Sequence, residues 1–274
     1  MNEVRNERNE LSSSAWLCVS FGGGTNSSAM LCGFKERGIR PDLIMMADTG
    51  AEHPHTYEHL KVMQRKVKDW WGLEIEVVRA KKTILEHCHD TKLYPSLAYG
   101  RRSCSQKFKH EPMEKRLAEL AKGAGVTRIT KAIGYDAGES RHLGKPESKE
   151  LRKGIVETYW YPLLEWGWKR DDCQKAICRN KLPKPGKSSC YICPAMRSNE
   201  IIALNGKHPE LMKKALDLEV MVNTGGKQRH KMGLGGREIM WADILKQDDE
   251  QMKLLDFLEQ YDAQHLPCGC SDGT

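Results

Sequence analysis

The stretch CVSFGGGTNSSAML, Cys18–Leu31, decides the fold. An apolar run ends at Phe21, three glycines follow, and apolar residues then recur at helical spacing. A strand, a glycine loop and a helix in this order can form an anion site. Glycines let backbone N–H groups approach the ligand, and the helix N-terminus adds partial positive charge. The stretch alone is equally compatible with a tight turn, because it matches neither G-x-x-x-x-G-K-[ST] nor G-x-G-x-x-G.

Outward from this stretch, strand and helix patterns alternate. The apolar segments have strand length, and the segments between them have helical periodicity. Parallel strands joined by helical crossovers are typical of a doubly wound sheet. The sequence therefore predicts an α/β fold with a mostly parallel, Rossmann-like sheet of five strands. The expected strands lie in 16–21, 41–50, 73–80, 126–137 and 154–166.

Three parts are expected along the chain. Residues 1–14 are polar and are expected to form a frayed tail. Residues 15–197 are expected to form a nucleotide-binding α/β domain with a Cys-rich loop. Residues 198–274 are expected to form a helical C-terminal extension that ends in a Cys-containing tail.

The composition is that of a globular protein: 274 residues, 39% apolar and 30% charged, with a net charge of +7. This mild positive charge permits an anionic ligand but does not require one. The start lacks an apolar signal core, and no apolar run reaches the roughly 18 residues of a membrane span. We therefore expect a cytoplasmic protein with no membrane partner, in which a reducing environment disfavours structural disulfides between the ten cysteines.

A second loop falls at the same sheet edge as the glycines. The segment ADTGAE, 47–52, ends the second strand, so that Asp48 follows a buried run. Ligands of open α/β sheets bind beyond the carboxyl ends of the strands. Two polar loops at one edge favour a ligand site there over a simple turn.

Some cysteines are candidates for chemistry, and others are expected only to pack in the core. Cys190 and Cys193 form Cys-x-x-Cys, which suits zinc, a redox pair or an iron–sulfur cluster. Cys104 is flanked by cations that favour the thiolate. Three cysteines in apolar or mixed surroundings are expected to be buried fillers of the core: Cys18, Cys32 and Cys88.

Several motifs together resemble the phosphoadenosine phosphosulfate (PAPS) reductase family of the adenine nucleotide alpha hydrolase (PP-loop) superfamily, and in particular its phage-type members. GGGTNS (22–27) is similar to the S-G-G-x-D-S pyrophosphate loop. Four further segments are similar to family segments in the expected order: ADTGAEHPHTYEHL (47–60), SCSQKFKHEP (103–112), GYDAGESRH (134–142) and WYPLLEW (160–166). The resemblance covers about residues 16–195.

The resemblance implies roles for individual residues. Cys104, Asp48 and Arg141 are the expected catalytic residues. An adenine nucleotide, either ATP or a sulfonucleotide, is expected to bind through Gly22, Gly23, Gly24, Thr25, Asn26, Ser27, Ser28, Asp48, Thr49, Gly50, Gly134, Glu139, Ser140, Arg102, Lys107 and Lys109. The basic members of this set suit oxyanions, because guanidinium groups bind them bidentately.

The resemblance also implies a [4Fe–4S] cluster, with Zn²⁺ as the alternative. The expected ligands are Cys104, Cys173, Cys190 and Cys193, with Cys178 as the substitute for Cys173. Mg²⁺ is a further expected cofactor, but Asn26 stands where the family has Asp and offers no carboxylate to that ion. Gly22 likewise replaces the usual Ser. These two departures leave open whether bound ATP is cleaved.

Three functions follow from these expectations. The first is activation of an acceptor at the α-phosphate of ATP followed by sulfur transfer. The second is thiol-dependent reduction of PAPS or adenosine phosphosulfate (APS) to sulfite, for which a C-terminal E-C-G-x-H motif is only faintly echoed at Cys268. The third is a non-catalytic subunit that binds nucleotide or nucleic acid. A nucleic-acid substrate or a sulfur-donor protein is the expected macromolecular partner, and the segment KQRHK, 227–231, is one basic patch that could contact nucleic acid.

Overall fold

The computed structural model describes residues 15–95, 103–139, 148–152, 154–225, 233–234 and 239–265. These residues form two compact units, which are described separately. The first unit is drawn from residues up to 87 and from 98–190, and the second from 88–97 and from 191 onward. Among the described residues, no helix combines the length and the apolar character needed to cross a membrane.

A six-stranded sheet is the centre of the first unit. Its strand order is β3-β2-β1-β4-β6-β5, and all neighbours are parallel except β5 and β6. The α/β, mostly parallel fold predicted from the sequence is confirmed, with the antiparallel edge strand β5 as an addition. The strands are β1 (Ala15–Ser20), β2 (Leu43–Asp48), β3 (Ile75–Arg79), β4 (Arg128–Ile133), β5 (Ser148–Arg152) and β6 (Ile155–Trp160).

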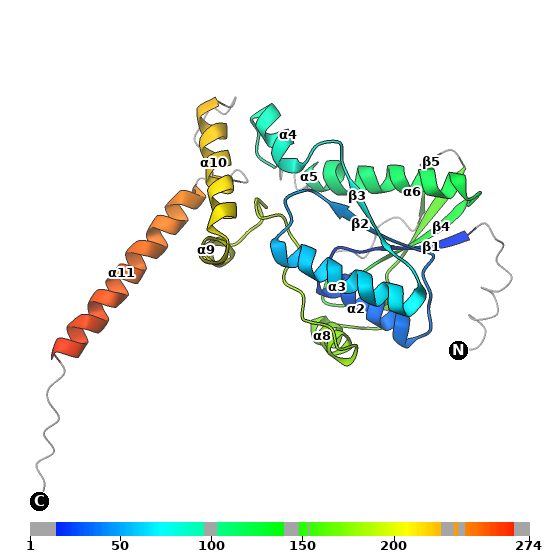
Figure 1. The fold of residues 1–274 in the computed structure, drawn as a ribbon, viewed down its shortest axis with the longest axis horizontal. Coiled ribbons are helices and arrows are strands. Elements are labelled where there is room, and N and C mark those ends of the chain that lie inside the picture. Colours follow the sequence, from blue (N-terminus) through cyan, green and yellow to red (C-terminus); the bar gives the residue numbers. More distant parts are fainter. Residues whose placement is uncertain are drawn as a thin grey trace, which may run out of the picture. The chain divides into compact units, whose positions relative to one another are not determined.

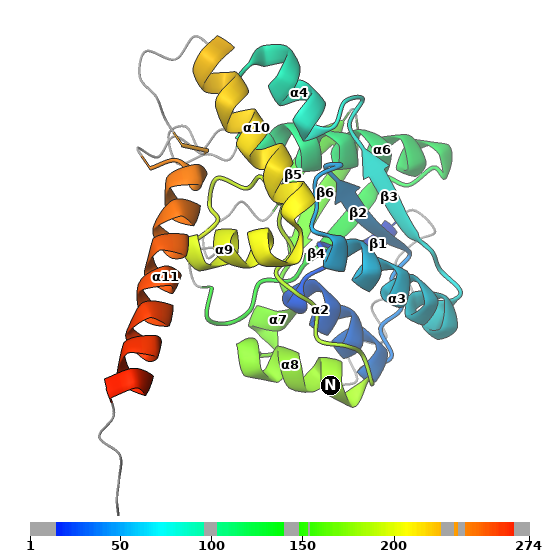
Figure 2. The ribbon, with the colours of Figure 1, turned by 60° about the vertical axis from the view of Figure 1, so that its left-hand side comes forward.

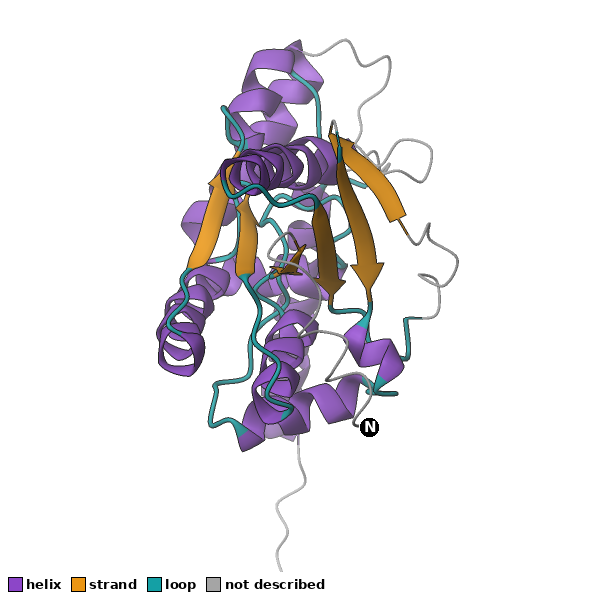
Figure 3. Ribbon diagram, turned by 90° about the vertical axis from the view of Figure 1, so that its right-hand side faces the viewer, coloured by secondary structure: helices purple, strands orange, loops and turns teal. Residues whose placement is uncertain are grey.

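Helices cover both faces of this sheet (Figure 3). Figures 1 and 2 both show α6 on the face opposite to α2 and α3. The helical elements of this unit are α2 (Thr25–Glu36), α3 (Pro54–Trp71), α5 (Ser103–Ser105), the π-helical turn η2 (Gln106–His110), α6 (Glu111–Gly123), α7 (Pro162–Glu165) and α8 (Arg170–Arg179). Helix α4 (Ile84–Thr91) runs from the first unit into the second.

Strand alternation divides the core into two clusters. In β1, Leu17 and Val19 join the cluster under α2 and α3, whereas Cys18 joins the cluster under α6. This is the result expected when successive side chains point to opposite faces of a sheet. Burying both faces is also why the strands read as continuous apolar runs.

The three filler cysteines are buried as predicted: Cys18, Cys32 and Cys88 have relative exposures of 0%, 0% and 1%. Burial raises the pKa of the first two thiols to about 12. They therefore stay protonated and belong to the packing.

The described part of the second unit is mainly helical. Its main helices are α9 (Ser198–Lys207), α10 (Pro209–Gly225) and α11 (Trp241–His265). The buried Glu219 of α10 accepts hydrogen bonds from the backbone N–H groups of Leu234 and Trp241. This carboxylate thereby ties the start of α11 to α10 within the unit.

Candidate functional site

The glycine loop connects β1 to α2 at the carboxyl edge of the sheet. Gly23 has φ +71°, a conformation that favours glycine. The N–H of Gly22 donates to Ser27 Oγ at 3.2 Å, and the Ser27 hydroxyl donates to the carbonyl of Gly24 at 3.2 Å. The loop is therefore folded back onto the first turn of α2.

Two glycines allow close approaches that define the space at this loop. A Cβ on Gly24 would lie 2.6 Å from Ser188 Oγ. A Cβ on Gly134, just after β4, would lie 3.0 Å from backbone atoms of Asn26 and Ser27. A side chain at Gly24 would move the Ser188 hydroxyl, and one at Gly134 would press on the backbone of the loop.

The first turn of α2 is arranged for an anion. Gly24 is the N-cap and has no side chain with which to cap the first-turn N–H groups. The buried Thr25 Oγ1 finds no hydrogen-bond partner in the described part of the chain. A cavity of about 320 Å³ opens here. We call it the phosphate cavity. Its lining residues are Ser20, Gly22, Gly24, Thr25, Asn26, Ser27, Ile133, Gly134, Tyr135, Glu139, Arg170, Gly186, Lys187 and Ser188.

Seven residues that line the phosphate cavity were not predicted from the sequence: Ser20, Ile133, Tyr135, Arg170, Gly186, Lys187 and Ser188. Arg170 begins α8, and Lys187 and Ser188 lie in the loop that follows this helix. The sequence signal for the last two is PGKSS, 185–189, a Gly-Lys-Ser turn beside the predicted Cys-x-x-Cys. Arg170 carries no such signal, because only the fold brings α8 to the loop.

Asn26 links two carboxylates to a guanidinium. Its Nδ2 donates to Asp136 Oδ2 at 3.1 Å and to Glu139 Oε2 at 3.0 Å. Its Oδ1 accepts from Arg170 Nη1 at 2.9 Å. An aspartate at this position could not make the two donations, so Asn26 matches the acidic pair that faces it.

Two buried side chains, Ser28 and His59, hold the glycine loop by a chain of hydrogen bonds. The Ser28 hydroxyl donates to the Gly24 carbonyl at 2.8 Å, and His59 Nε2 lies 2.8 Å from Ser28 Oγ. Burial, followed by the charge of His55, lowers the pKa of His59. A neutral imidazole that carries its proton on Nε2 donates to Ser28 Oγ and completes the chain of bonds.

Asp48 is fully engaged within the protein. It accepts from the N–H of Gly50 at 2.8 Å, from Tyr57 OH at 2.7 Å and from Arg79 Nε at 2.8 Å. Burial alone would raise the pKa of Asp48, but these three donors together lower it. Gly50 itself has φ +75°, and a side chain added at this position would clash with Thr83 Cγ2. These contacts fix the positions of Asp48 and Gly50 beside the site.

A second polar cluster surrounds Cys190. Thr49 Oγ1 lies 3.0 Å from Cys190 Sγ and 3.2 Å from Glu52 Oε1. The buried Glu52 also forms an ion pair through its Oε1 with Lys109 Nζ at 2.8 Å. The other oxygen of Glu52, Oε2, finds no hydrogen-bond partner in the described segments. Glu52 and Cys190 additionally form a backbone bridge. Thr49 and Lys109, both predicted from the sequence, are therefore grouped with this cysteine.

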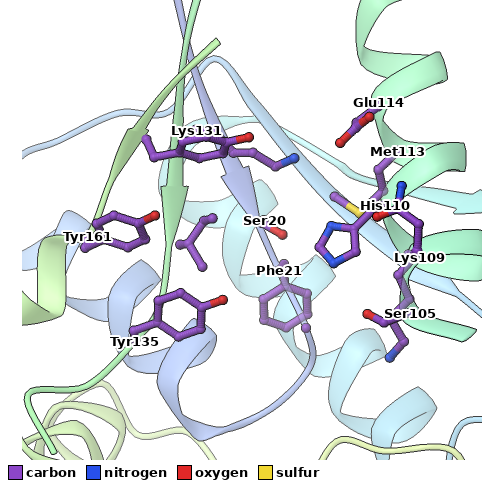
Figure 4. A pocket seen from close by; sticks show the side chains of 15 residues that line it. Ser20, Phe21, Ser105, Lys109, His110, Met113, Glu114, Lys131, Tyr135 and Tyr161 are labelled. Carbon is purple, nitrogen blue, oxygen red and sulfur yellow. The ribbon is translucent and has the colours of Figure 1, made fainter. Parts of the chain in front are cut away.

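A second cavity of about 390 Å³ adjoins the phosphate cavity, because the two share Ser20, Gly22, Ile133 and Tyr135. In Figure 4, Tyr135 and Tyr161 line one side and His110 and Met113 the other, with Phe21 between them. Aromatic and apolar walls with a few polar groups suit a flat ring system. We call this space the aromatic cavity.

A buried ion pair forms part of the wall of the aromatic cavity. Lys131 Nζ lies 3.2 Å from Glu157 Oε1, and both side chains are almost fully buried. Tyr159 OH donates to Glu157 Oε2 at 3.0 Å. The pair sits on the neighbouring strands β4 and β6, so its geometry is set by the sheet.

The proposed metal ligands are not gathered into one group. Cys173 is fully buried in the apolar cluster between α8 and α2, and burial raises its pKa to about 12. Cys104 lies half-buried in α5, Cys190 lies in the cluster described above, and Cys193 belongs to the second unit. Among the described residues, no group of three or more His, Cys, Asp or Glu side chains is placed to hold a metal ion. As placed, Cys173 does not fit a cluster ligand.

The remaining sequence-predicted residues are dispersed. Glu139 lines the phosphate cavity, whereas Lys107 lies outside it beside His87. Arg102, Ser140 and Arg141 lie outside the described residues, as do Cys268, Cys270 and the KQRHK patch.

Residues 16–185 match the sequence model of the phosphoadenosine phosphosulfate reductase domain, which is well over half of the chain. The chain belongs to this family. The region that matches the PAPS reductase domain includes the glycine loop, Asp48 and the segment Gly134–Glu139. No curated protein matches the chain.

Two solved structures are similar to this PAPS reductase family member. One is the phosphoadenylyl-sulfate reductase of Candida auris in a phosphate complex, with 19% identity, a TM-score of 0.44, and coverage of 69% of this chain and 87% of that chain. The other is the U34-tRNA thiolase NcsA of Methanococcus maripaludis with its [4Fe–4S] cluster, with 16% identity, a TM-score of 0.41, and coverage of 88% and 83%.

Proposed function

We propose that this chain is an enzyme that binds an adenine nucleotide and uses it in sulfur chemistry. The observation that carries the proposal is the phosphate cavity. Free N–H groups of the α2 N-terminus, the Arg170 guanidinium and Lys187 all border it. Helix N-termini and cations of this kind bind phosphate groups.

The aromatic cavity is the proposed place for the adenosine part of the ligand. It adjoins the phosphate cavity and offers the rings of Phe21, Tyr135 and Tyr161. A nucleotide would then lie across the carboxyl edge of β1 and β4, with its charge at the glycine loop. Asp136 and Glu139 supply the hard oxygen donors that suit a Mg²⁺ ion accompanying the phosphates.

The proposed reaction is activation followed by sulfur transfer. An acceptor oxygen attacks the α-phosphorus of ATP, the bond to the bridging oxygen breaks, and pyrophosphate leaves with that electron pair. A sulfur nucleophile then forms its bond to the acceptor carbon and displaces AMP. The chain's own part is to hold the phosphates with the α2 N–H groups, Arg170 and Lys187, which would offset the charge on the leaving pyrophosphate.

Nucleotide binding is tested by Gly24→Ala. The new Cβ would meet Ser188 Oγ at 2.6 Å, so the Ser188 side chain must turn away or the 186–188 segment must shift, and either movement changes the wall of the phosphate cavity. We expect at least a tenfold loss of ATP affinity by isothermal titration calorimetry, which corresponds to about 1.4 kcal/mol. Gly123→Ala is the matched control, because a Cβ there meets nothing within 4 Å. Equal affinities in the two variants would contradict the proposal.

The two reactions are distinguished by their products. The protein is incubated with ATP and Mg²⁺, and separately with PAPS and a thiol donor. Pyrophosphate release supports activation, and sulfite release supports the alternative, thiol-dependent reduction of PAPS or APS. Nucleotide binding with neither product would favour a non-catalytic binding subunit.

We propose separately that Cys190 and Cys193 belong to a [4Fe–4S] cluster, on the ground of their Cys-x-x-Cys spacing. Such a group would supply electron-transfer or sulfur-binding chemistry when bound. We expect anaerobically purified protein to contain about four iron atoms per chain. Cys190→Ser should abolish this iron, whereas Cys32→Ala is the control, because Cys32 is a buried packing cysteine of α2. Stoichiometric zinc without iron would refute the cluster.

A further inference from the structure

A groove of about 650 Å³ lies along η2 and α6 and shares no lining residue with the two cavities at the glycine loop. It is bounded by the end of β3 and the turn after it, by α4, and by η2 with α6. All its residues belong to the first unit. We call it the basic groove. Its lining residues are Val78, Arg79, Ala80, Lys81, Lys82, His87, Lys107, Phe108, Glu111, Pro112, Lys115, Arg116 and Glu119.

Positive charge predominates in the basic groove. Six of its lining side chains are Lys or Arg and only two are carboxylates. Some of this charge is compensated nearby, since Arg79 pairs with Asp48 and Arg116 with Glu76. Lys115 and Glu119 lie 4.0 Å apart, which is a weak exposed contact.

The clearest surplus is at Lys107 and Lys81. Lys107 Nζ lies 3.3 Å from His87 Nε2. An ammonium group only donates, so the imidazole nitrogen must accept, and the contact brings no negative charge. Lys81 is exposed on the turn after β3 and makes no ion pair with the described residues. Two cations that line the groove thus have no carboxylate partner in the described part of the chain.

The dimensions suit an extended anion. The α6 residues that line the groove run from Glu111 to Glu119, which spans about 12 Å along the helix. A stacked nucleic-acid strand rises by about 3.4 Å per nucleotide, so that length corresponds to roughly three nucleotides. Val78, Ala80 and Pro112 provide apolar surface between the cations, against which sugars and bases can pack.

We propose that the basic groove binds a nucleic-acid strand through its phosphodiester backbone. Repeated contacts between cations and phosphate groups give affinity that does not depend on sequence. The groove shares no lining residue with the phosphate cavity or the aromatic cavity. The proposal therefore stands independently of the nucleotide chemistry proposed for those cavities.

The test measures binding of a labelled single-stranded oligonucleotide by fluorescence anisotropy at several salt concentrations. Lys81→Glu combined with Lys107→Glu should weaken binding at least tenfold. The slope of log K against log salt should fall by about 1.4, from roughly 0.7 for each lost phosphate contact on a single strand. Lys35→Glu combined with Lys61→Glu is the control, because it makes the same charge change at exposed sites of α2 and α3 on the other face of the sheet.

The outcomes are distinct. Selective loss in the groove variant supports the proposal. Equal loss of affinity in both variants would show that binding depends on the net charge of the protein and not on the groove. Unchanged binding in the groove variant would show that the groove is not the site. Either result overturns the proposal, as would groove-dependent binding to phosphatidylserine vesicles in preference to the oligonucleotide. Calorimetric ATP binding is measured on Lys81→Glu alone and on the control variant and should stay unchanged, so that failure here is separate from failure of the proposed function.

Discussion

Replacing Glu157 with Ala is expected to lower the free energy of unfolding by about 3–5 kcal/mol, because it leaves a buried cation without its partner. Lys131 and Glu157 are 3.2 Å apart and almost fully buried on adjacent central strands. Tyr159 OH would lose its acceptor as well. For a chain of this size, each kcal/mol corresponds to roughly 2–4 °C in the unfolding midpoint.

Urea unfolding of Glu157→Ala, Lys131→Met and the double variant Lys131→Met/Glu157→Leu tests this expectation. An apolar pair of similar volume removes both charges together, so the double variant should lose much less than the sum of the single losses. Glu150→Ala on the edge strand β5 is the control, since Glu150 is exposed. Additive losses would mean that the two charges do not interact.

The double variant also separates stability from ligand binding. Lys131 lines the aromatic cavity, where its ammonium could contact a bound nucleotide. If the ion pair only holds the sheet, the folded double variant should bind ATP with an affinity close to that of the original chain. Calorimetry at a temperature at which both are folded gives this comparison.

Asp48→Asn is expected to cost roughly 3 kcal/mol of unfolding free energy, because it removes the charge that accepts from Arg79 and Tyr57. The side chain is isosteric, so no cavity is created. If Asp48 only makes these contacts, ATP affinity of the folded variant should change little. A large loss of affinity without a loss of stability would instead return Asp48 to the catalytic role predicted from the sequence.

The same variant should alter the acid sensitivity of the protein. The folded-state pKa of Asp48 lies below its unfolded value, because the Gly50, Tyr57 and Arg79 donors outweigh burial. Its contribution to stability is therefore complete above the unfolded pKa of about 4 and is lost as the pH falls through the folded pKa. The stability difference between the two proteins should shrink as the pH is lowered below about 4. Urea midpoints at neutral and acidic pH measure it.

Much of the fold could be predicted from the sequence, because strands buried on both faces are continuous apolar runs between helical periods. The five predicted strands are the five parallel members of the sheet. The sixth strand, β5, was missed because SKELR carries no apolar alternation. An edge strand can form through backbone pairing alone and leaves little trace in the pattern of side chains.

The site was predictable only where its residues are local in sequence. The glycine loop and Glu139 follow strands and were found from that position. Arg170 reaches Asn26 across 144 positions, and Glu52 reaches Cys190 across 138, and no periodicity encodes such distances. The roles of Asp48 and Gly50 were predicted from their place at the sheet edge. Their hydrogen bonds and conformations are visible only in the folded chain.

The walls of the phosphate cavity come from four separate parts of the chain: Ser20–Ser27, Ile133–Glu139, Arg170 and Gly186–Ser188. Contacts so distant in sequence must overcome a loop-closure cost and so tend to form slowly. During synthesis the cavity cannot exist until the ribosome has released residue 188. A chain truncated before Gly186 should accordingly lack nucleotide affinity. During refolding, the rate at which nucleotide affinity appears would measure the rate at which the four segments come together. Bound nucleotide would in turn favour the assembled state by mass action.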